Sequence, residues 1–249
     1  MTSKSPDALG REKALVASRA AAWIAPGMRI GIGSGATVAL FVEALGRRHA
    51  REGLDVQCVA ASEATARLAS AAGLDVRGFD VGLPLDVAVD GADESGPGLD
   101  MLKGGGGALL RERIVASAAR FVLIIADSSK PVERLGRFPL PVEVGPFGAD
   151  LARADLAALG AKPALRTVPG GHEPMITDEG NWIFDCHMAA IPDPTQLAMS
   201  LAQVRALAAH GLFLGVADAA FIADGAETFL LGPDASRASV TVEIAAPFG

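Results

Sequence analysis

The stretch LKGGGGALLRE, residues 102–112, sets a lysine and four consecutive glycines before a glutamate in the first turn of an expected helix. Glycine lets the backbone adopt positive φ and approach a ligand closely. Side chains on helices lean towards the amino terminus, so we expect Glu112 to point back at the glycine turn. We expect Leu110, Ile114 and Ala118 to form the apolar face, away from Glu112. A carboxylate placed there could exchange protons with a ligand; a solvated glutamate between two arginines is the simpler alternative.

GIGSGAT, residues 31–37, lies between an expected strand and an expected helix. Backbone N–H groups and the helix dipole would form an anion site there, with the Ser34 and Thr37 hydroxyls as further donors. The segment also fits the loose dinucleotide-binding fingerprint, but the next strand ends in Ala60-Ala61-Ser62 without the required acid. The sequence therefore favours a phosphate-binding loop over a nicotinamide site; a plain tight turn is the remaining alternative.

Two further polar loops follow expected strands. DGADE, residues 90–94, comes directly after Val89, and ADSSK, residues 126–130, overlaps the end of the apolar run FVLIIA. Asp90 and Asp93 could cap a helix, bind sugar hydroxyls, ligate a hard cation or move protons. Lys130 could join the same edge of the sheet or be an ordinary surface lysine. Four such loops at one edge predict a ligand site more strongly than any single motif.

Strands alternate with helices in the first half of the chain. Alternation of this kind predicts a parallel sheet covered by helices on both faces, a doubly wound, Rossmann-like α/β domain. The expected strands span residues 29–33, 56–60, 87–89 and 121–126, and the expected helices residues 8–24, 37–48, 63–72 and 108–120.

The pattern changes near Pro139. A β-α-β-β-α-β order predicts a ferredoxin-like α+β unit. Its expected strands are residues 141–144, 164–168, a hairpin within 175–186 that turns at Asp178 to Asn181, and 212–217; its helices are residues 149–159 and 194–209. We predict a Rossmann-like catalytic domain of residues 1–138 plus 212–249 and a small domain of residues 139–211. ETFLLG and VTVEIA are expected to add two strands to the main sheet.

Composition excludes several classes of function. The 249 residues carry a net charge of −7 and no long basic run, so we expect no nucleic-acid partner and no anionic membrane surface. Apolar runs are too short to span a bilayer, and the first residues lack the apolar core of a secretory signal. Two distant cysteines and four scattered histidines give neither a disulfide framework nor zinc-ligand spacing. We expect a cytoplasmic protein without a metal.

The motifs GIGSGAT, VDGADE, LKGGGGALLRE and ADSSK, in this order and spacing, resemble ribose-5-phosphate isomerase of type A. FPLPVEV at 138–144 and the NWIFD segment match too. The resemblance implies a doubly wound domain with a ferredoxin-like small domain, a homodimer or homotetramer, and no metal or organic cofactor. It implies the interconversion of ribose 5-phosphate and ribulose 5-phosphate in the non-oxidative pentose phosphate pathway.

The resemblance also implies roles for residues. Glu112 corresponds to the proton acceptor, with Asp90, Asp93 and Lys103 as further catalytic groups. The implied substrate-binding residues are Ser34, Gly35, Ala36, Thr37, Asp90, Gly91, Ala92, Asp93, Lys103, Gly104, Gly105, Gly106 and Lys130. Lys13 falls near a family lysine in a segment that matches loosely. Ser34, Ala36, Leu110 and Arg113 replace the usual Thr, Ser, Thr and Lys, which affects fine substrate contacts.

The expected mechanism uses Glu112 as one base that moves a proton through a cis-enediol(ate), whose charge Lys103 and glycine N–H groups hold. The helix dipole would lower the Glu112 pKa and desolvation would raise it; we expect desolvation to prevail once substrate is bound. Asp90 or Asp93 would help to open the sugar ring. The alternatives are a non-catalytic sugar-phosphate sensor and an NAD-dependent oxidoreductase.

Overall fold

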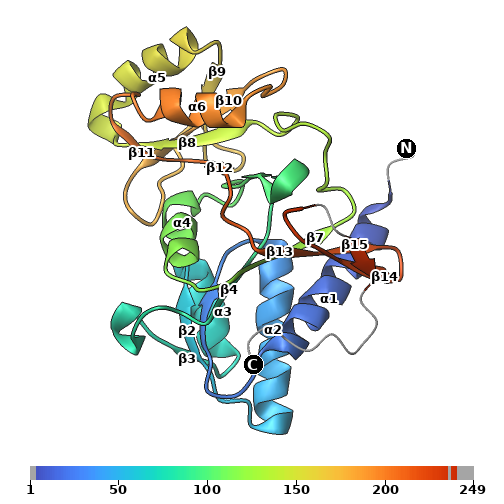
Figure 1. Ribbon diagram of the computed structural model, residues 1–249. Coiled ribbons are helices and arrows are strands. Elements are labelled where there is room, and N and C mark those ends of the chain that lie inside the picture. Colours follow the sequence, from blue (N-terminus) through green and yellow to red (C-terminus); the bar gives the residue numbers. More distant parts are fainter. Residues whose placement is uncertain (1–3, 235–236, 240–249) are drawn as a thin grey trace.

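A central sheet of eight strands organises the molecule (Figure 1). The computed structural model describes residues 4–234 and 237–239. Strands follow the order β15-β14-β13-β7-β4-β1-β2-β3, and the run from β13 to β3 is parallel throughout. Their bounds are β1 Arg29–Ile32, β2 Gln57–Ala60, β3 Asp75–Val76, β4 Val87–Asp90, β7 Val122–Asp127, β13 Ala219–Asp224, β14 Glu227–Leu231 and β15 Arg237–Ser239. The predicted α/β class with a mostly parallel sheet is confirmed.

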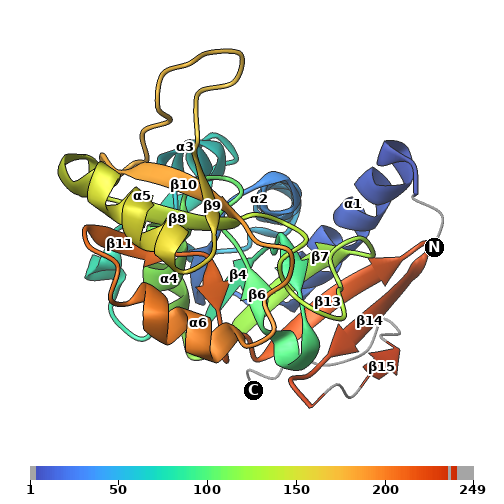
Figure 2. The same ribbon diagram turned by 90° about the horizontal axis from the view of Figure 1, so that it is seen from above.

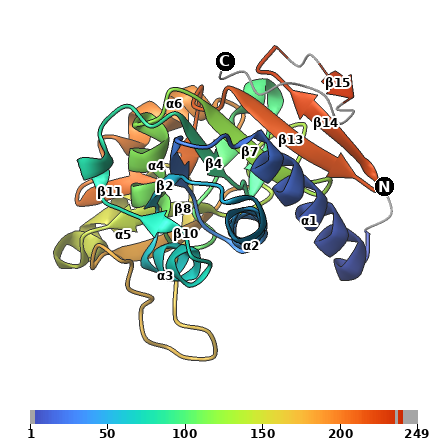
Figure 3. The ribbon, with the colours of Figure 1, turned by 90° about the horizontal axis from the view of Figure 1, so that it is seen from below.

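Helices cover both faces of this sheet. Alternate side chains of a strand point to opposite faces. Leu123 and Ile125 of β7 accordingly pack into one core with α1 and α2, while Ile124 and Ala126 pack into a second core with α4. Helices α1 and α2 lie side by side (Figure 3). The helices are α1 Pro6–Trp23, α2 Ala36–Glu52, α3 Glu63–Ala71 and α4 Leu109–Ser117.

A second, four-stranded antiparallel sheet has the order β11-β8-β10-β9. Two helices, α5 and α6, supply apolar side chains to the core on its outer side (Figure 2). Along the chain these elements follow the expected β-α-β-β-α-β order. Their bounds are β8 Leu140–Val144, α5 Ala149–Ala158, β9 Lys162–Leu165, β10 Trp182–His187, α6 Pro194–Leu201 and β11 Leu207–His210.

Two strand predictions in this region are wrong. The turn at Asp178 to Asn181 forms as expected, with the Thr177 N–H donating to the Asn181 carbonyl at 2.9 Å, but residues 175–177 before it form no strand, and β10 pairs with β8 and β9. The connection between β9 and β10 projects from the body instead (Figure 2). The fourth strand of the sheet is β11, whereas the expected strand at 212–217 is only β12, Leu212–Phe213. That short strand joins a third sheet with β5, Glu94–Ser95, and β6, Met101–Leu102.

The end of the described chain completes the large sheet. ETFLLG supplies β14, as expected, whereas β13 was not predicted even though it pairs in parallel with β7 along its length. The expected strand VTVEIA, residues 240–245, lies outside the described residues. In the described residues, short 3-10 helices occur in the loops at Phe79–Val81, Pro97–Leu99 and Pro146–Gly148. Within the described part of the chain, no helix has the length and apolar character needed to cross a bilayer.

Candidate active site

The site begins where β1 and β4 end side by side. Because the two strands are parallel neighbours, the loops that follow them meet at the same edge of the sheet. The N–H of Gly33 donates to the Val89 carbonyl at 2.9 Å. A Cβ on Gly33 would lie 1.9 Å from Oδ1 of Asp90, so only glycine allows the two loops to approach this closely.

Asp90 and Lys103 form a buried ion pair behind these loops. Oδ2 of Asp90 lies 2.8 Å from Nζ of Lys103, and each side chain is almost completely buried. Oδ1 accepts hydrogen bonds from the N–H groups of Ser34, at 3.2 Å, and Gly91, at 2.7 Å. Lys103 also donates to the Gly91 carbonyl at 2.8 Å. Burial lowers the pKa of Lys103, but the charges of Asp90 and Glu112 outweigh burial and hold that pKa above its ordinary value.

Glu112 lies on the other side of the same ammonium. Its side chain is 3% exposed, Oε1 accepts a 2.5 Å hydrogen bond from the Ser34 hydroxyl, and Oε2 is 3.3 Å from Nζ of Lys103. Among the described residues, none donates a hydrogen bond to Oε2. Desolvation raises the Glu112 pKa and the Asp90 charge adds to this, while Lys103 and Ser34 act in the opposite direction. The carboxylate is thereby kept more basic than an exposed glutamate.

The structure corrects the predicted orientation of α4. Leu109, Glu112, Val115 and Ala116 form its buried face, whereas Ile114, expected in the core, is 45% exposed. The apolar seam is shifted by one residue because Leu109 fills the space below the glycine turn, where it contacts Ile183 of the second sheet. Glu112 therefore lies on the buried face of the helix, next to Lys103.

The glycine turn between β6 and α4 has a conformation that requires glycine. Gly104 has φ +100°, and a Cβ there would also crowd Leu109 and Pro141. The N–H of Gly105 donates to Oδ2 of Asp93 at 2.7 Å, which joins the turn to the acidic loop. Arg166 donates to the Gly104 carbonyl at 2.8 Å. Sequence reasoning missed Arg166, because nothing in its local pattern distinguishes it from a surface arginine.

The four loops enclose a cavity of about 290 Å³. All predicted substrate-binding residues line it except Asp90, which lies behind Lys103. The lining consists of Lys13, Ser34, Gly35, Ala36, Thr37, Gly91, Ala92, Asp93, Lys103, Gly104, Gly105, Gly106, Glu112 and Lys130. Residues from positions 13 to 130 thus meet in one pocket, with carboxylates and ammonium groups around it.

Lys13 is the addition that the structure makes to the predicted pocket. It projects from α1 with Nζ 3.5 Å from Oδ2 of Asp127, at the end of β7. The only sequence signal was a lysine near the chain start within a loosely matched segment. Arg113, one of the noted departures, lies outside the cavity lining. It donates to the carbonyls of His210 and Leu212 and lies 4.3 Å from the centroid of the Phe213 ring.

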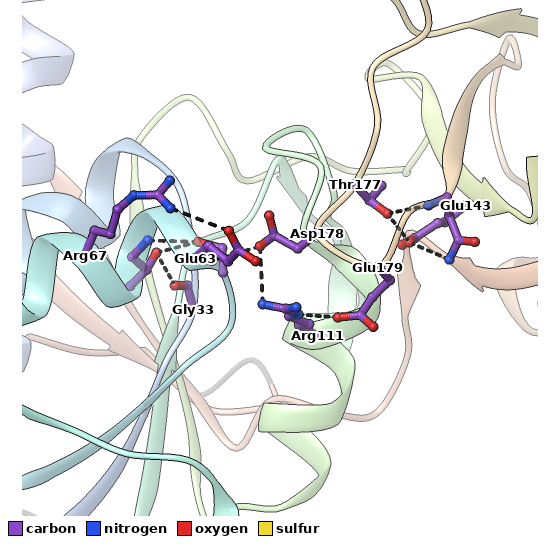
Figure 4. A network of polar contacts seen from close by, with 11 residues as sticks. Gly33, Glu63, Arg67, Arg111, Glu143, Thr177, Asp178 and Glu179 are labelled. Carbon is purple, nitrogen blue, oxygen red and sulfur yellow. Dashed lines mark hydrogen bonds and ion pairs between the residues drawn. The ribbon is translucent and has the colours of Figure 1, made fainter.

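A polar network connects the second sheet to α3 and α4 (Figure 4). Oδ2 of Asp178 accepts from the N–H of Glu63 at 2.8 Å, at the start of α3. Arg111 donates to Glu179 and lies 3.5 Å from Asp178. Glu143 of β8 accepts hydrogen bonds from Thr177 and Asn181, which fixes the turn between them. The turn at 177–181 therefore contacts the helix that carries Glu112.

The cavity combines two carboxylates with three ammonium groups at the edge of a mostly parallel α/β sheet, an arrangement suited to proton transfer on an anionic, hydroxylated substrate, as in the class of sugar-phosphate isomerases. No cluster of three His, Cys, Asp or Glu side chains suited to a metal ion occurs among residues 4–234 and 237–239.

Comparison with known proteins narrows the class. The family model described as ribose 5-phosphate isomerase A (phosphoriboisomerase A) matches residues 57–227, and the chain belongs to that family. Ribose-5-phosphate isomerase A of Roseiflexus castenholzii is 49% identical over 236 residues, 93% of this chain and 99% of the relative. That of Nitrobacter hamburgensis is 45% identical over 223 residues, 87% and 94% of the two chains.

Solved structures agree with this assignment. Ribose 5-phosphate isomerase A from Methanocaldococcus jannaschii superposes with a TM-score of 0.85 at 32% identity, covering 89% of this chain and 98% of the other. A D-ribose-5-phosphate isomerase in complex with phospho-erythronic acid gives a TM-score of 0.86 at 31% identity, covering 90% and 99%. The resemblance inferred from the four motifs is confirmed.

Proposed function

We propose that this chain interconverts ribose 5-phosphate and ribulose 5-phosphate, with Glu112 as the single proton-transferring base. The observation that carries the proposal is the Oε2 atom of Glu112. It is buried at the cavity, accepts no hydrogen bond from a described residue and lies 3.3 Å from the Lys103 ammonium. A carboxylate oxygen with a free lone pair beside a fixed positive charge has the properties of a general base next to an oxyanion site.

In the forward direction Glu112 removes the proton from C2 of the open-chain aldose. The electrons of the C–H bond form a C1–C2 double bond, and the carbonyl oxygen on C1 takes up negative charge and then the proton that the C2 hydroxyl releases. Glu112 returns its proton to C1 while the C2 hydroxyl loses its own and becomes the ketone. Lys103 and the N–H groups of the glycine turn stabilise the negative oxygen of the cis-enediolate.

Asp93 is our candidate for ring opening. Both oxygens of Asp90 are occupied, one by the N–H groups of Ser34 and Gly91 and the other by Lys103. Asp93 lines the cavity, and among the described residues the hydrogen bond that it accepts is the one from the Gly105 N–H to Oδ2. We assign proton transfer between the ring oxygen and the anomeric hydroxyl to Asp93, and the placement of Lys103 to Asp90.

The phosphate is proposed to bind at the end of the cavity formed by Lys13, Lys130 and the loop of residues 34–37. The two lysines lie on different elements but line the same pocket as the N-terminal turn of α2. Ammonium groups together with N–H groups at a helix start are suited to a phosphate dianion. The relative solved with phospho-erythronic acid supports a phosphorylated ligand.

We also propose a catalytic domain of residues 1–138 plus 212–249 and a small domain of residues 139–211. Their separate sheets and largely separate apolar cores support this division. A homodimer or homotetramer in the cytoplasm completes the proposal, on the strength of the family resemblance.

The decisive experiment incubates the purified protein with ribose 5-phosphate and a chelator and measures ketose formation. In heavy water, deuterium should appear on the carbon next to the carbonyl, because the base exchanges its proton with solvent. Ketose formation without any solvent deuterium would contradict the enediolate route, and absence of ketose would contradict the activity itself.

A further inference from the structure

Glu12 is a buried carboxylate that the proposed chemistry does not use. It lies on α1 with 1% of its surface exposed. Oε2 accepts from the backbone N–H of Ser128 at 3.0 Å and from its hydroxyl at 2.8 Å. Oε1 accepts from the N–H of Gly225 at 2.8 Å and from the ammonium of Lys4. Four donors from three separate segments therefore converge on one side chain.

The hydrogen bonds keep this carboxylate ionised. Burial raises the pKa of Glu12, but the donors Lys4, Gly225 and Ser128 outweigh burial and lower that pKa to about 2. A buried ion that is fully satisfied holds its partners in defined positions, whereas removal of one partner leaves a costly unpaired group. Glu12 thus connects α1 to the loop after β7 and to the turn between β13 and β14. We call Glu12 with its donors Lys4, Ser128 and Gly225 the Glu12 joint.

Both lysines at the proposed phosphate end lie on segments that the Glu12 joint connects. Lys13 follows Glu12 directly on α1, and Lys130 lies two residues beyond Ser128. Asp127 supports the same joint, because its Oδ1 accepts from the N–H of Ser129 at 2.9 Å while its Oδ2 faces Lys13. The N–H of Lys130 donates to the Asp127 carbonyl at 3.2 Å.

We propose that Glu12 is a positioning residue for the phosphate of the substrate, because it fixes the separation between Lys13 on α1 and Lys130 on the β7 loop. The inference rests on the proposed function and adds a residue outside the pocket to it. Glu12 does not line the cavity. It acts through the two ammonium groups, and its loss should weaken binding at the phosphate end while the Glu112 end stays intact.

The test is Glu12→Gln in the full chain. An amide places N–H hydrogens opposite the N–H donors of either Ser128 or Gly225, so the joint opens while side-chain size is kept. We expect KM for ribose 5-phosphate and the inhibition constant of inorganic phosphate to rise together, by roughly tenfold, equivalent to about 1.4 kcal/mol. We expect kcat to stay within about twofold, because transition-state contacts at Glu112 are unchanged.

A matched control is Glu43→Gln, the same substitution at a glutamate of α2 that is 53% exposed and pairs with Arg47. Its KM should stay within about twofold of the parent. A double-mutant cycle with Lys130→Met gives the second readout. If Glu12 acts through Lys130, the KM of the double variant will rise by less than the product of the two single-variant factors. Independent effects would give the full product.

Ser128→Ala serves if Glu12→Gln does not fold, since it removes one of the two Ser128 hydrogen bonds. It should raise KM and the phosphate inhibition constant in the same direction by a smaller factor. Unchanged KM in both variants, or a fall in kcat alone, would overturn the inference and leave Glu12 a purely structural residue. Failure of the proposed function differs from either result, because the unmodified protein would then form no ketose.

Discussion

Nζ of Lys103 lies 3.3 Å from Oε2 of Glu112, and the two side chains are 4% and 3% exposed. At such a distance inside a protein, the ammonium strongly favours the ionised carboxylate, while burial opposes it. The pKa of Glu112 is nevertheless raised, so burial together with the nearby Asp90 charge prevails over Lys103. The pair thus provides a base that holds a proton more firmly than a surface glutamate, next to a charge that can stabilise an oxyanion.

Glu112→Gln keeps the side-chain shape and removes the base. We expect kcat to fall by about 10²-fold or more, the usual contribution of general base catalysis. Steady-state turnover and deuterium exchange from solvent measure the effect. Glu43→Gln, on the exposed side of α2, is the control and should leave turnover unchanged. Turnover of Glu112→Gln near that of the parent would rule out the assigned role.

The same variant should change stability with a defined sign. Glu112 has a folded pKa above its unfolded value of about 4.3, so between these values the folded state binds more protons than the unfolded state. Its contribution to stability is therefore present at low pH and is lost as pH rises through that window. Glutamine carries no such pH-dependent cost, and Lys103 keeps Asp90 as its partner at 2.8 Å.

Thermal melting should accordingly place Glu112→Gln at or above the parent at neutral pH. The difference should narrow as the pH approaches about 4.3. A variant that melts well below the parent at neutral pH would show that the ion pair with Lys103 outweighs the desolvation of Glu112.

Two substitutions should move the acid limb of kcat/KM in opposite directions. The Ser34 hydroxyl lowers the Glu112 pKa, so Ser34→Ala should shift the limb to higher pH. The Asp90 charge raises that pKa, so Asp90→Asn should shift it to lower pH. The unmodified enzyme should lose activity as pH falls through a value above the ordinary glutamate pKa. If the acid limb moved in the same direction in both variants, Glu112 would be refuted as the titrating group.

The elements that frame the site were predictable because their signals are local. The β-rich run RIGIG gave β1, and the continuous apolar runs VAV and FVLIIA gave β4 and β7, each with a Gly-, Asp- or Lys-containing loop at its end. Glu112 was expected to lie off the apolar face of α4, whereas the structure places it on the buried face of that helix. Periodicity alone did not distinguish the Leu109 face of α4 from the Ile114 face, since which face is buried depends on what packs against it.

Arg166 was missed, and Lys13 was noted only through a loosely matched family segment, because both contacts depend on distant segments. Lys13 and Arg166 reach the site from α1 and from the connection after β9, and neither carries a local motif. β13 escaped prediction because its first residues, Ala219 and Ala220, are weak strand formers; pairing with β7 makes the strand. The donors to Glu12 from Ser128 and Gly225 lie 116 and 213 residues away from it along the chain.

Gly33→Ala should disturb the site through a steric clash with Asp90. The added Cβ would lie 1.9 Å from Asp90 Oδ1, so Asp90 must move and Lys103 loses its partner. We expect destabilisation of about 1–3 kcal/mol, typical of overpacking, and a fall in kcat. Gly10→Ala in α1 is the control, since nothing lies within 4 Å of its Cβ. That change should stabilise the protein by about 0.5–1 kcal/mol in urea unfolding.

Arg111→Gln tests the network between the turn at 177–181 and α4. Arg111 is partly exposed, so its loss should cost at most about 1 kcal/mol of folding stability. That cost should shrink at high ionic strength, because salt screens the attraction to Asp178 and Glu179. Urea unfolding at two salt concentrations measures this cost. Arg153→Gln is the reference, because Arg153 forms an exposed ion pair with Asp150. A cost independent of salt would contradict an electrostatic role.

The backbone N–H of Lys103 donates to the Gly211 carbonyl at 2.9 Å, and a Cβ on Gly211 would meet the Lys103 carbonyl at 2.3 Å. The chain next to Lys103 and the chain next to Gly211 thus pack backbone against backbone, in line with the antiparallel pair of β6 and β12. Adding or deleting one residue in either segment would shift Lys103 along the strand direction by about 3.3 Å, the rise of one residue. Length variation among natural relatives should therefore avoid these two segments and collect in the projecting connection between β9 and β10.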